Sequence, residues 1–272
     1  VAWYEDWFDS DLYEVVYRSR NLADAQRLAD LIVRVADPSP EAPILDVGTG
    51  RGRHARVLAR RGYHVTGLDL SENAIETARR RAEREGLSDR TAFVTGDMRL
   101  PHFQARFGGV VNLFSTFGYF SDEADHGRAI QAMAAALTPG GWLVQDLLNP
   151  PYVRARLVPR DDQTVSVPKA SGETSAIRVV QERRIVEPEP GRPRVEKTIT
   201  MTPQAPHGTA GDTPEGEPVV FTESVRLLTP DALAPLYAAA GLETVALYGD
   251  YDGAPYSDAS PRLIVHAVAR GH

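Results

Sequence analysis

The sequence predicts a Rossmann-like α/β fold, with a seven-stranded, mostly parallel sheet and helices on both faces. Short apolar runs alternate with helical patterns through the first half of the chain, which is typical of parallel strands joined by helices. A glycine-rich turn at 48–52 follows the first apolar run and precedes a helical pattern. We expect an N-terminal helical lid before the sheet and an antiparallel β insertion after its fifth strand.

The elements of the first half follow from periodicity and from helix start and stop signals. Apolar residues between 12 and 36 lie partly at the three-to-four spacing of amphipathic helices, and a proline-rich segment ends them. Ser71 is a plausible N-cap and Gly86 a plausible helix end. The expected strands are 44–47, 64–70, 91–98, 108–114 and 142–148, and the expected helices between them are 54–61, 72–85 and 122–137.

After residue 150 the pattern changes from alternating strands and helices to β-rich runs. The runs at 176–186 and 194–202 predict an antiparallel hairpin, and a third strand is expected at 219–228, after a Pro/Gly-rich loop at 203–218. A helix is expected from Thr229 to Gly241, followed by two final strands that form the edge hairpin of the main sheet. The predicted organisation is a lid (1–37), a core (38–150 and 227–272) and an insertion (151–226) that caps substrate, forms a dimer contact, or does both.

The composition excludes some classes of function. The formal net charge is -7 and Lys169 and Lys197 are the only lysines, which argues against a protein that binds nucleic acid by neutralising phosphates. No apolar run is long enough to span a membrane. The acidic, aromatic start does not resemble a signal peptide, so we expect a cytoplasmic protein. Cysteine is absent, which excludes disulfides and thiolate chemistry.

Acidic residues stand at the ends of three expected strands. Asp46 begins the glycine turn, Asp69 follows Gly50 by nineteen residues, and Asp97 precedes Met98 in "TGDM". A carboxylate at the Asp69 position can accept hydrogen bonds from both hydroxyls of a ribose. The turn also fits the GxGxx(G/A) pattern, so a nicotinamide or flavin enzyme is an alternative.

Together with "LTPGG" before strand five, this set resembles the class I S-adenosylmethionine-dependent methyltransferases. The resemblance implies S-adenosyl-L-methionine as cofactor and S-adenosyl-L-homocysteine as product. We expect the cofactor to contact Asp46, Gly48, Thr49, Gly50, Asp69, Leu70, Asp97, Met98, Leu113, Phe114, Tyr17 and Arg20.

More narrowly, the aromatic N-terminus, "FSTFGYF" after strand four and the β insertion resemble small-molecule N-methyltransferases, including those that act on amino sugars. In that group a histidine often stands where this chain has Tyr119, so the identity of any general base is open. Tyr119, His126 and Asp146 are the candidate catalytic residues. Candidate substrate residues are Tyr4, Tyr13, Phe117, Asn149 and Arg262.

Each candidate also has a structural interpretation. His126 is compatible with a solvated helix position, Tyr13 and Tyr17 with packing, and Arg20 and Arg262 either with surface positions or with binding a carboxylate of cofactor or substrate. The acceptor is a small molecule with a nitrogen or oxygen nucleophile, and a homodimer is possible. A non-catalytic protein that binds S-adenosylmethionine, and an NAD(P)-dependent oxidoreductase, are the alternatives.

The tetrapeptide Asn149-Pro150-Pro151-Tyr152 resembles a motif of DNA methyltransferases that act on amino groups. In those enzymes the motif follows strand four, whereas here it comes one strand and one helix later. We interpret it as the proline-rich exit of a strand. No nucleic-acid partner is expected.

Overall fold

The computed structural model describes residues 2–10, 12–17, 22–168, 174–204 and 216–270. The contacts within the chain divide it into two compact units. The core unit comprises Arg20–Ala155 and Leu227–His272, and the β-rich unit comprises Val1–Ser19 and Arg156–Arg226.

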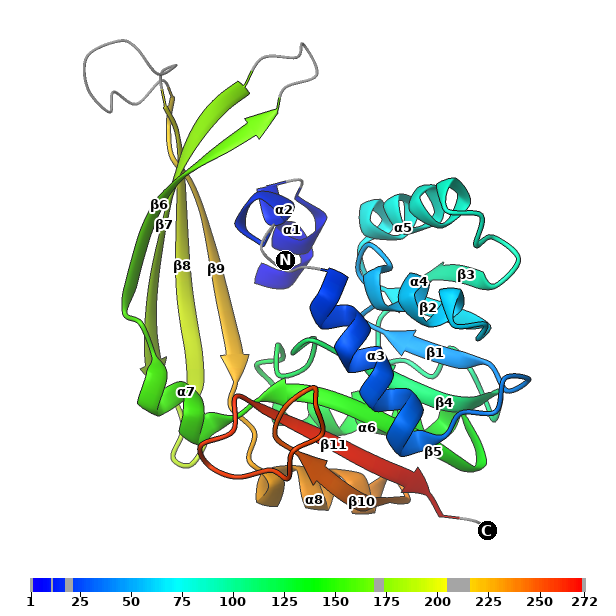
Figure 1. The fold of residues 1–272 in the computed structure, drawn as a ribbon. Helices are drawn as coiled ribbons and strands as arrows, with labels where there is room; N and C mark the ends of the chain where they lie inside the picture. The colour runs from blue at the N-terminus through cyan, green and yellow to red at the C-terminus, as the bar shows by residue number, and fades with distance from the viewer. Residues whose placement is uncertain (1, 11, 18–21, 169–173, 205–215, 271–272) are drawn as a thin grey trace. The chain divides into compact units, whose positions relative to one another are not determined.

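A seven-stranded sheet forms the core unit, in the order β10-β11-β5-β4-β1-β2-β3 (Figure 1). Neighbouring strands are parallel except for the pairs β5–β11 and β10–β11. The strands are β1 (Ile44–Val47), β2 (Val65–Asp69), β3 (Thr91–Thr95), β4 (Phe107–Asn112), β5 (Leu137–Leu148), β10 (Leu242–Tyr248) and β11 (Arg262–Ala269). The expected fold class is confirmed, including the edge hairpin of the last two strands.

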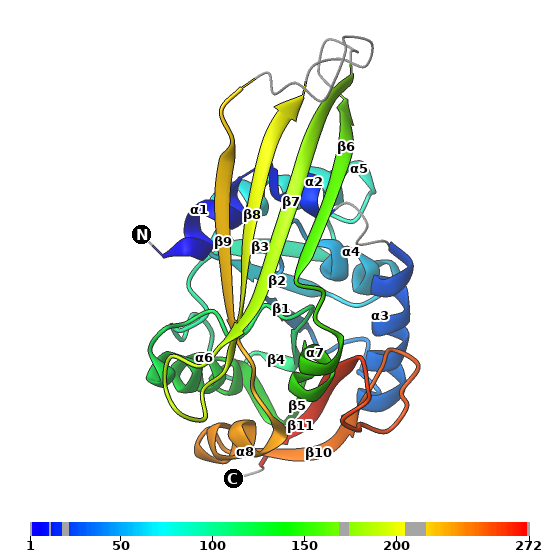
Figure 2. The same ribbon diagram turned by 90° about the vertical axis from the view of Figure 1, so that its left-hand side faces the viewer.

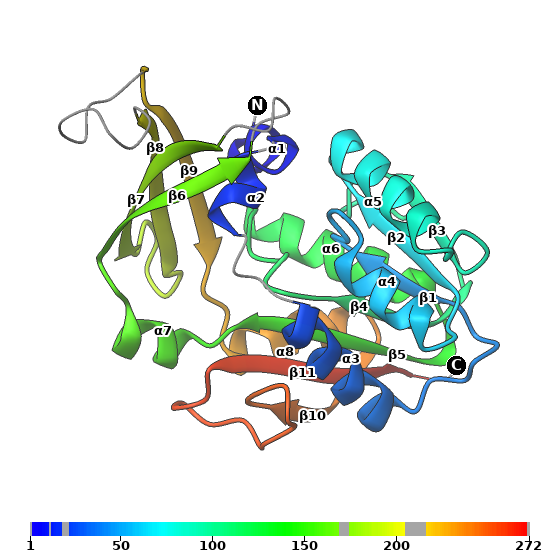
Figure 3. The ribbon, with the colours of Figure 1, turned by 45° about the horizontal axis from the view of Figure 1, so that its top comes forward.

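Helices cover both faces of this sheet, as Figure 3 shows. Ile44 packs in one apolar cluster with residues of α3, α4 and α5, whereas the next residue, Leu45, lies with Met133 of α6 on the opposite face. The helices of the core unit are α3 (Leu22–Ala36), α4 (Arg53–Arg60), α5 (Glu72–Arg84), α6 (Glu123–Ala136), α7 (Pro150–Arg156) and α8 (Pro230–Ala239). The strand order reverses between β1 and β4, and ligands of open α/β sheets bind at the carboxyl ends of the strands beside such a reversal.

The segment "TPGG", expected as a turn before strand five, is a bulge within β5. Leu137 pairs with Phe107 and Trp142 pairs with Gly109, so the four residues between Leu137 and Trp142 have only Gly108 opposite them. A Cβ at Gly109 would lie 2.1 Å from the indole of Trp142, so a glycine is required there.

The β-rich unit contains a four-stranded antiparallel sheet in the order β6-β7-β8-β9 (Figure 2). Its strands are β6 (Arg160–Pro168), β7 (Thr174–Val186), β8 (Arg194–Gln204) and β9 (Val219–Arg226). The hairpin and the third strand expected in the insertion are confirmed. Strand β6 and helix α7 were not predicted, because "RDDQTVSVP" has few apolar residues and pairs with β7 only in the folded chain. Most of the loop expected at 203–218 lies outside the described residues.

The first two helices belong to the β-rich unit. Helices α1 (Trp3–Asp9) and α2 (Leu12–Val16) bury Trp7 and Val16 in one cluster with Val165, Val179, Ile199 and Met201 of the sheet. By contrast, helix α3, which was expected in the lid, packs in the core unit. It does so because its buried residues recur at helical spacing and form one apolar stripe.

Among the residues that the structure describes, no helix is both long enough and apolar enough to cross a membrane.

Candidate functional site

The glycine turn joins β1 to α4 at the carboxyl edge of the sheet. Gly48, Gly50 and Gly52 have φ of +73°, +54° and +72°, a region that favours glycine. A Cβ at Gly48 would lie 2.8 Å from Thr116, so the turn packs closely against the loop after β4. At Gly50 a Cβ would meet nothing within 4 Å, so the backbone there faces open space that a ligand can approach.

Two carboxylates flank this turn. Asp69 Oδ2 accepts from the amide of Gly50 at 2.7 Å, and its Oδ1 accepts from the amide of Ser71 at 3.0 Å. Burial raises the pKa of Asp69, although these amide hydrogen bonds oppose the shift. A carboxylate has about four acceptor sites, so Asp69 keeps capacity to accept from a ligand donor. The next residue, Leu70, has 41% of its surface exposed beside this carboxylate.

Asp46 lies almost fully buried beneath the same turn. Burial raises its pKa to about 7, and the nearby Asp69 charge adds to this effect, while the hydrogen bond from Thr49 opposes it. Thr49 Oγ1 donates to Asp46 Oδ2 at 2.7 Å. The Asp46 carboxyl therefore holds the turn from below.

Asp97 follows β3, as expected, but an arginine engages its carboxylate. Arg99 Nη2 lies 2.6 Å from Asp97 Oδ2, and Arg99 also donates to Asp125 of α6. Burial would raise the pKa of Asp97, but the hydrogen bonds and charge of Arg99 outweigh it, so that the pKa is lowered. This ion pair could not be predicted from the sequence, because Arg99 stands in an irregular segment.

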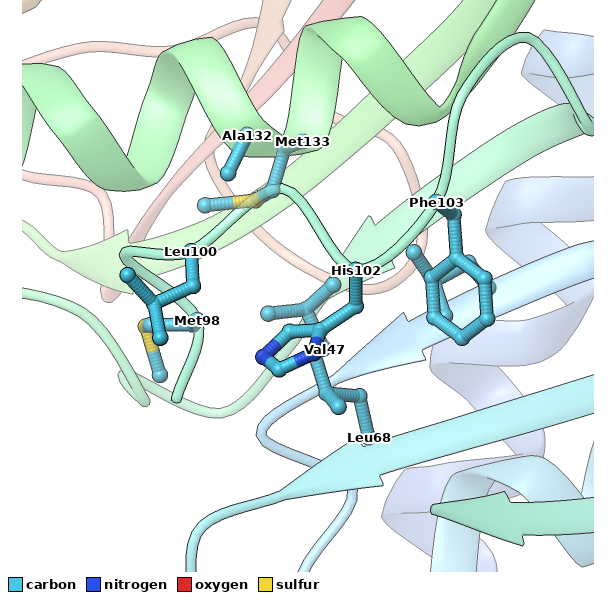
Figure 4. Close-up of a pocket in the computed structure, with 9 residues that line it drawn as sticks. Val47, Leu68, Met98, Leu100, His102, Phe103, Ala132 and Met133 are labelled. Carbon is cyan, nitrogen blue, oxygen red and sulfur yellow. The ribbon is translucent and has the colours of Figure 1, made fainter. Parts of the chain in front are cut away.

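Met98 lines an apolar pocket between the carboxyl ends of β1 and β2 and helix α6 (Figure 4). His102 is the one lining residue with a polar side chain, and its Nε2 lies 2.9 Å from the carbonyl oxygen of Asp97. The pocket is lined by Leu45, Val47, Leu68, Met98, Leu100, His102, Phe103, Ala132 and Met133. Met98 thus connects the end of β3 to the apolar interior.

The loop after β4 is fastened to the glycine turn by buried amides. Asn112 Nδ2 donates to the carbonyl of Val47 at 2.9 Å and to Thr116 Oγ1 at 2.7 Å. Gln145 donates to Asn112 and accepts from the hydroxyl of Tyr237. Sequence reasoning missed this chain of hydrogen bonds. Its only signal was that Asn112 and Gln145 interrupt runs of apolar residues in two expected strands.

Asp146, a candidate catalytic residue, is fully buried and is an ion-pair partner of Arg262. Arg262 Nε lies 2.7 Å from Asp146 Oδ1, and Oδ2 accepts from the amide of Phe114 and the hydroxyl of Tyr251, both at 3.0 Å. The nearby Asp146 charge raises the pKa of Arg262 against the opposing effect of burial. Arg262, a candidate substrate residue, therefore has its guanidinium engaged by the protein.

The other candidate residues of this loop differ in exposure. Leu113 and Phe117 are buried, whereas Tyr119 is partly exposed. His126 is fully buried rather than solvated, and its ring lies 5.2 Å from that of Phe117 and 5.3 Å from that of Phe120. Of the three candidate catalytic residues, Tyr119 alone has part of its surface accessible.

Asn149, a candidate substrate residue, is completely buried. Its amide nitrogen donates to the carbonyls of Ser257, Asp258 and Ser260, and its oxygen accepts from the hydroxyl of Tyr256. Asn149 thus holds the 256–260 loop, and its polar atoms are engaged by protein rather than directed at a substrate.

The N-terminal candidates lie in the β-rich unit. The hydroxyl of Tyr17 donates to Glu223 and accepts from Lys197, and Lys197 Nζ lies 2.6 Å from Glu223 Oε2. Tyr13 and Tyr17 both pack against the apolar cluster around Trp7, and Tyr4 is partly buried. Arg20 lies outside the described residues.

The structure therefore brings Asp46, Gly48, Thr49, Gly50, Asp69 and Phe114 together at one edge of the core sheet. The open backbone at Gly50, the acceptor atoms of Asp69 and the exposed side chain of Leu70 are groups at this edge that a ligand with hydroxyl donors and an aromatic ring can contact.

Known proteins that are similar to this chain are methyltransferases. The methyltransferase domain family matches residues 44–141. A dTDP-3-amino-3,6-dideoxy-alpha-D-glucopyranose N,N-dimethyltransferase of Streptomyces fradiae is 31% identical over 201 residues, which cover 71% of this chain and 76% of the relative. A dTDP-3-amino-3,4,6-trideoxy-alpha-D-glucopyranose N,N-dimethyltransferase of Streptomyces venezuelae is 32% identical over 164 residues, which cover 58% and 67%.

A solved structure is similar over nearly the whole chain. It is that of SAM-bound CalS10, an amino pentose methyltransferase of Micromonospora echinaspora, with 25% identity and a TM-score of 0.64 over 95% of this chain and 97% of that chain. The expected cofactor and the transfer of a methyl group to a small-molecule acceptor are confirmed, and neither the oxidoreductase nor the non-catalytic alternative is favoured. The chain belongs to the S-adenosylmethionine-dependent methyltransferases and, within them, is similar to the amino-sugar N-methyltransferases.

Proposed function

We propose that the chain methylates the amino nitrogen of a nucleotide-linked amino sugar. The cofactor part of the proposal rests on the carboxyl edge of the core sheet, where the open Gly50 backbone is hydrogen-bonded to the Asp69 carboxylate. The similarity to two N,N-dimethyltransferases of dTDP-amino sugars supports an amine as the acceptor.

The proposed cofactor contacts follow from the chemistry of each side chain. Asp69 accepts from the ribose hydroxyls, Leu70 covers one face of the adenine, and Gly48 to Gly50 let the backbone approach the methionine part. Asp97 retains only limited capacity to accept from the adenine amino group, because Arg99 engages both carboxylate oxygens. Because Asp97 and Met98 follow β3 at the carboxyl edge of the sheet, we still propose that they lie at the adenine end of the site. Leu113, Phe114, Tyr17 and Arg20 stay as proposed contacts.

The sulfonium of the bound cofactor supplies an electrophilic methyl group, so the protein needs chiefly to hold the acceptor in line and exclude water. Tyr119 is the proposed residue beside the acceptor, where its hydroxyl can orient an amine or accept a proton from it. Asp146 is better explained as a positioning residue, because it is fully buried and accepts hydrogen bonds from Arg262, Phe114 and Tyr251. His126 is fully buried against the rings of Phe117 and Phe120, so direct contact with an acceptor is disfavoured.

The β-rich unit is proposed to select the acceptor. Its N-terminal helices carry Tyr4 and Tyr13, which are proposed to contact the acceptor. These helices cover one face of its sheet. A homodimer contact through the insertion, a cytoplasmic location and the lack of a nucleic-acid partner stay predictions. The net charge of -7 supports the last of these.

Calorimetry and mass spectrometry test the proposed function together. We expect the purified protein to bind S-adenosylhomocysteine and to add one or two methyl groups to a nucleotide-linked amino sugar. The hydroxy-sugar analogue and the free amino sugar serve as matched comparisons. If only the hydroxy analogue is methylated, the acceptor atom is an oxygen and the proposed amine acceptor is wrong. A lack of S-adenosylhomocysteine binding would reject the proposed cofactor site.

A further inference from the structure

Two neighbouring residues other than glycine adopt the left-handed backbone region in the loop after β4. Phe114 and Ser115 both have φ of +61°. L-residues disfavour this region because the Cβ approaches the following carbonyl oxygen, and only the surrounding structure can maintain two such residues in succession. The loop therefore needs an external constraint, which the residues around it supply.

The constraint comes from the ends of β5 and β11. The amide of Phe114 donates to Asp146 Oδ2 at 3.0 Å, and the amide of Ser115 donates to the carbonyl of Asp146 at 2.9 Å. Arg262 donates through Nε to Asp146 Oδ1 at 2.7 Å and through Nη2 to Ser115 Oγ at 2.8 Å. A single guanidinium thus bridges the Asp146 carboxylate and the strained turn. This bridge uses N–H donors on two different nitrogen atoms.

The turn determines where the Phe114 ring lies. The Arg53 guanidinium carbon stands 4.7 Å from the centre of that ring, and the His54 ring centre is 6.2 Å away. Arg53 and His54 begin α4, directly after the glycine turn. The Arg262 guanidinium carbon lies 5.8 Å from the same ring, so Phe114 packs between β11 and the start of α4.

We propose that Arg262 and Asp146 are positioning residues that hold Phe114 and Ser115 in the left-handed turn, and so set the Phe114 ring as a wall of the cofactor site. A buried ion pair is by itself weak evidence for stabilisation, and a specific conformation is the better explanation for this one. The inference rests on the proposed cofactor site. It differs from the sequence expectation that Arg262 binds a carboxylate of substrate or cofactor.

The test variant is Arg262→Lys, which keeps a positive charge for Asp146 but carries all three of its donors on one nitrogen, so it does not reproduce the contacts that Nε and Nη2 make with Asp146 and Ser115. Hydrogen–deuterium exchange of peptides that span 113–119 reports the turn without any ligand, and we expect it to become faster. Calorimetry with S-adenosylhomocysteine should show about tenfold weaker binding, since population of relaxed loop conformations reduces the competent fraction.

A second substitution separates positioning from direct contact. Ser115→Gly removes the Oγ acceptor but makes φ above zero easily accessible, so in the Arg262→Lys background it should restore binding to within about threefold of the parent protein. Arg270→Lys, at an exposed arginine after β11, is the matched control and should change neither measurement.

The outcomes are distinct. Unchanged exchange and affinity in Arg262→Lys overturn the inference. Weaker binding with unchanged exchange, not restored by Ser115→Gly, shows that Arg262 contacts the ligand directly and also overturns it. A parent protein that does not bind S-adenosylhomocysteine rejects the cofactor site, whereas the exchange data still decide the turn. If Arg262→Lys melts at a much lower temperature, Tyr251→Phe is the replacement variant. It removes one neutral donor to Asp146 and should accelerate hydrogen exchange in the same peptides.

Discussion

Asp69 shows how a single strand-end carboxylate can both shape a loop and serve a ligand. It orders the glycine turn through the amide of Gly50 and still has lone pairs at the edge of the sheet. The isosteric Asp69→Asn keeps one acceptor oxygen but loses the charge and the second acceptor. This residue therefore carries the sharpest test of the proposed cofactor site.

We expect Asp69→Asn to weaken S-adenosylhomocysteine binding by about 1.5 to 3 kcal/mol, the usual contribution of hydrogen bonds to a charged group. Titration calorimetry measures it, and Asp89→Asn, at an exposed aspartate beyond the end of α5, is the control. Equal affinity in Asp69→Asn and the parent protein would remove Asp69 from the site.

Tyr119→Phe tests the chemistry at the acceptor. Once an acceptor is identified, we expect turnover to fall by at least about tenfold, equivalent to about 1.4 kcal/mol of transition-state stabilisation, with cofactor affinity nearly unchanged. Steady-state kinetics and calorimetry on the same preparation separate the two effects. Equal turnover would leave proximity and orientation as the mechanism.

Asp46 makes stability depend on pH. Its pKa is raised to about 7 in the folded protein, from 3.8 in the absence of burial, so the folded state binds more protons between these values. The contribution of Asp46 to the free energy of unfolding is therefore greatest below the lower pKa and falls as the pH rises to the upper one, by roughly 4 kcal/mol in total at about 1.4 kcal/mol per pH unit. In Asp46→Asn this loss should be absent from denaturant unfolding curves recorded between about pH 5 and pH 8. If the free energy of unfolding changes equally with pH in the two proteins across that range, the raised pKa of Asp46 is contradicted.

At the scale of elements, the N-terminal helices have a clear packing role in the β-rich unit. Trp7 is fully buried, its ring centre lies 4.4 Å from that of Phe221, and its indole donates to Glu223 at 2.7 Å. Deletion of 1–21, the obvious test of a lid, would uncover the apolar face of the four-stranded sheet. We expect that deletion to destabilise the unit, so it cannot separate a lid from a packing element.

Tyr17→Phe is the better test of the lid. It removes one hydroxyl from the cluster of Glu223 and Lys197 while keeping the ring in place. If residues 1–21 close over the cofactor, turnover and cofactor affinity should both fall, while the melting temperature changes by only a few degrees, about what the loss of 1 kcal/mol produces. Trp7→Phe is the packing control and should lower the melting temperature instead. Full activity in Tyr17→Phe would remove the Tyr17 hydroxyl from the proposed cofactor contacts.

At the scale of the whole molecule, the division into two units predicts a division of labour. The core unit carries every described residue proposed to contact the cofactor except Tyr17, and the β-rich unit has an independent sheet and apolar cluster. On the other face of that sheet, ion pairs join neighbouring strands, among them Arg160–Glu182 and Arg184–Glu196. Such exposed pairs are typical of a solvated face.

Exchange of residues 156–226 for the aligned segment of the Streptomyces fradiae relative tests this division. We expect the chimera to bind S-adenosylhomocysteine with nearly parental affinity and to change its preference among nucleotide-linked amino sugars, because acceptor contacts are proposed to come from this unit. The reciprocal chimera is the control. An unchanged acceptor preference would place selection in the core unit.

The sequence alone was sufficient for the fold class and for the positions of the glycine turn and Asp69. These depend on local information: a strand, a glycine turn and a helix adjoin each other in the chain, and the carboxyl ends of parallel strands must meet at one edge. Ser71 and Thr229 cap their helices as expected, since a cap bonds only to the next turn.

Only the tertiary structure decided what the remaining candidates do. Asn149 is bonded to a loop more than 100 positions away, Asp146 is paired with Arg262 across 116 positions, and His126 is buried between two phenylalanines. A polar residue at a strand end has the same sequence signature whether it faces a ligand or a distant arginine. Its role depends on long-range packing that side-chain type and spacing do not encode, and this is why the sequence could place the glycine turn and Asp69 but not the protein partners of Asn149 and Asp146.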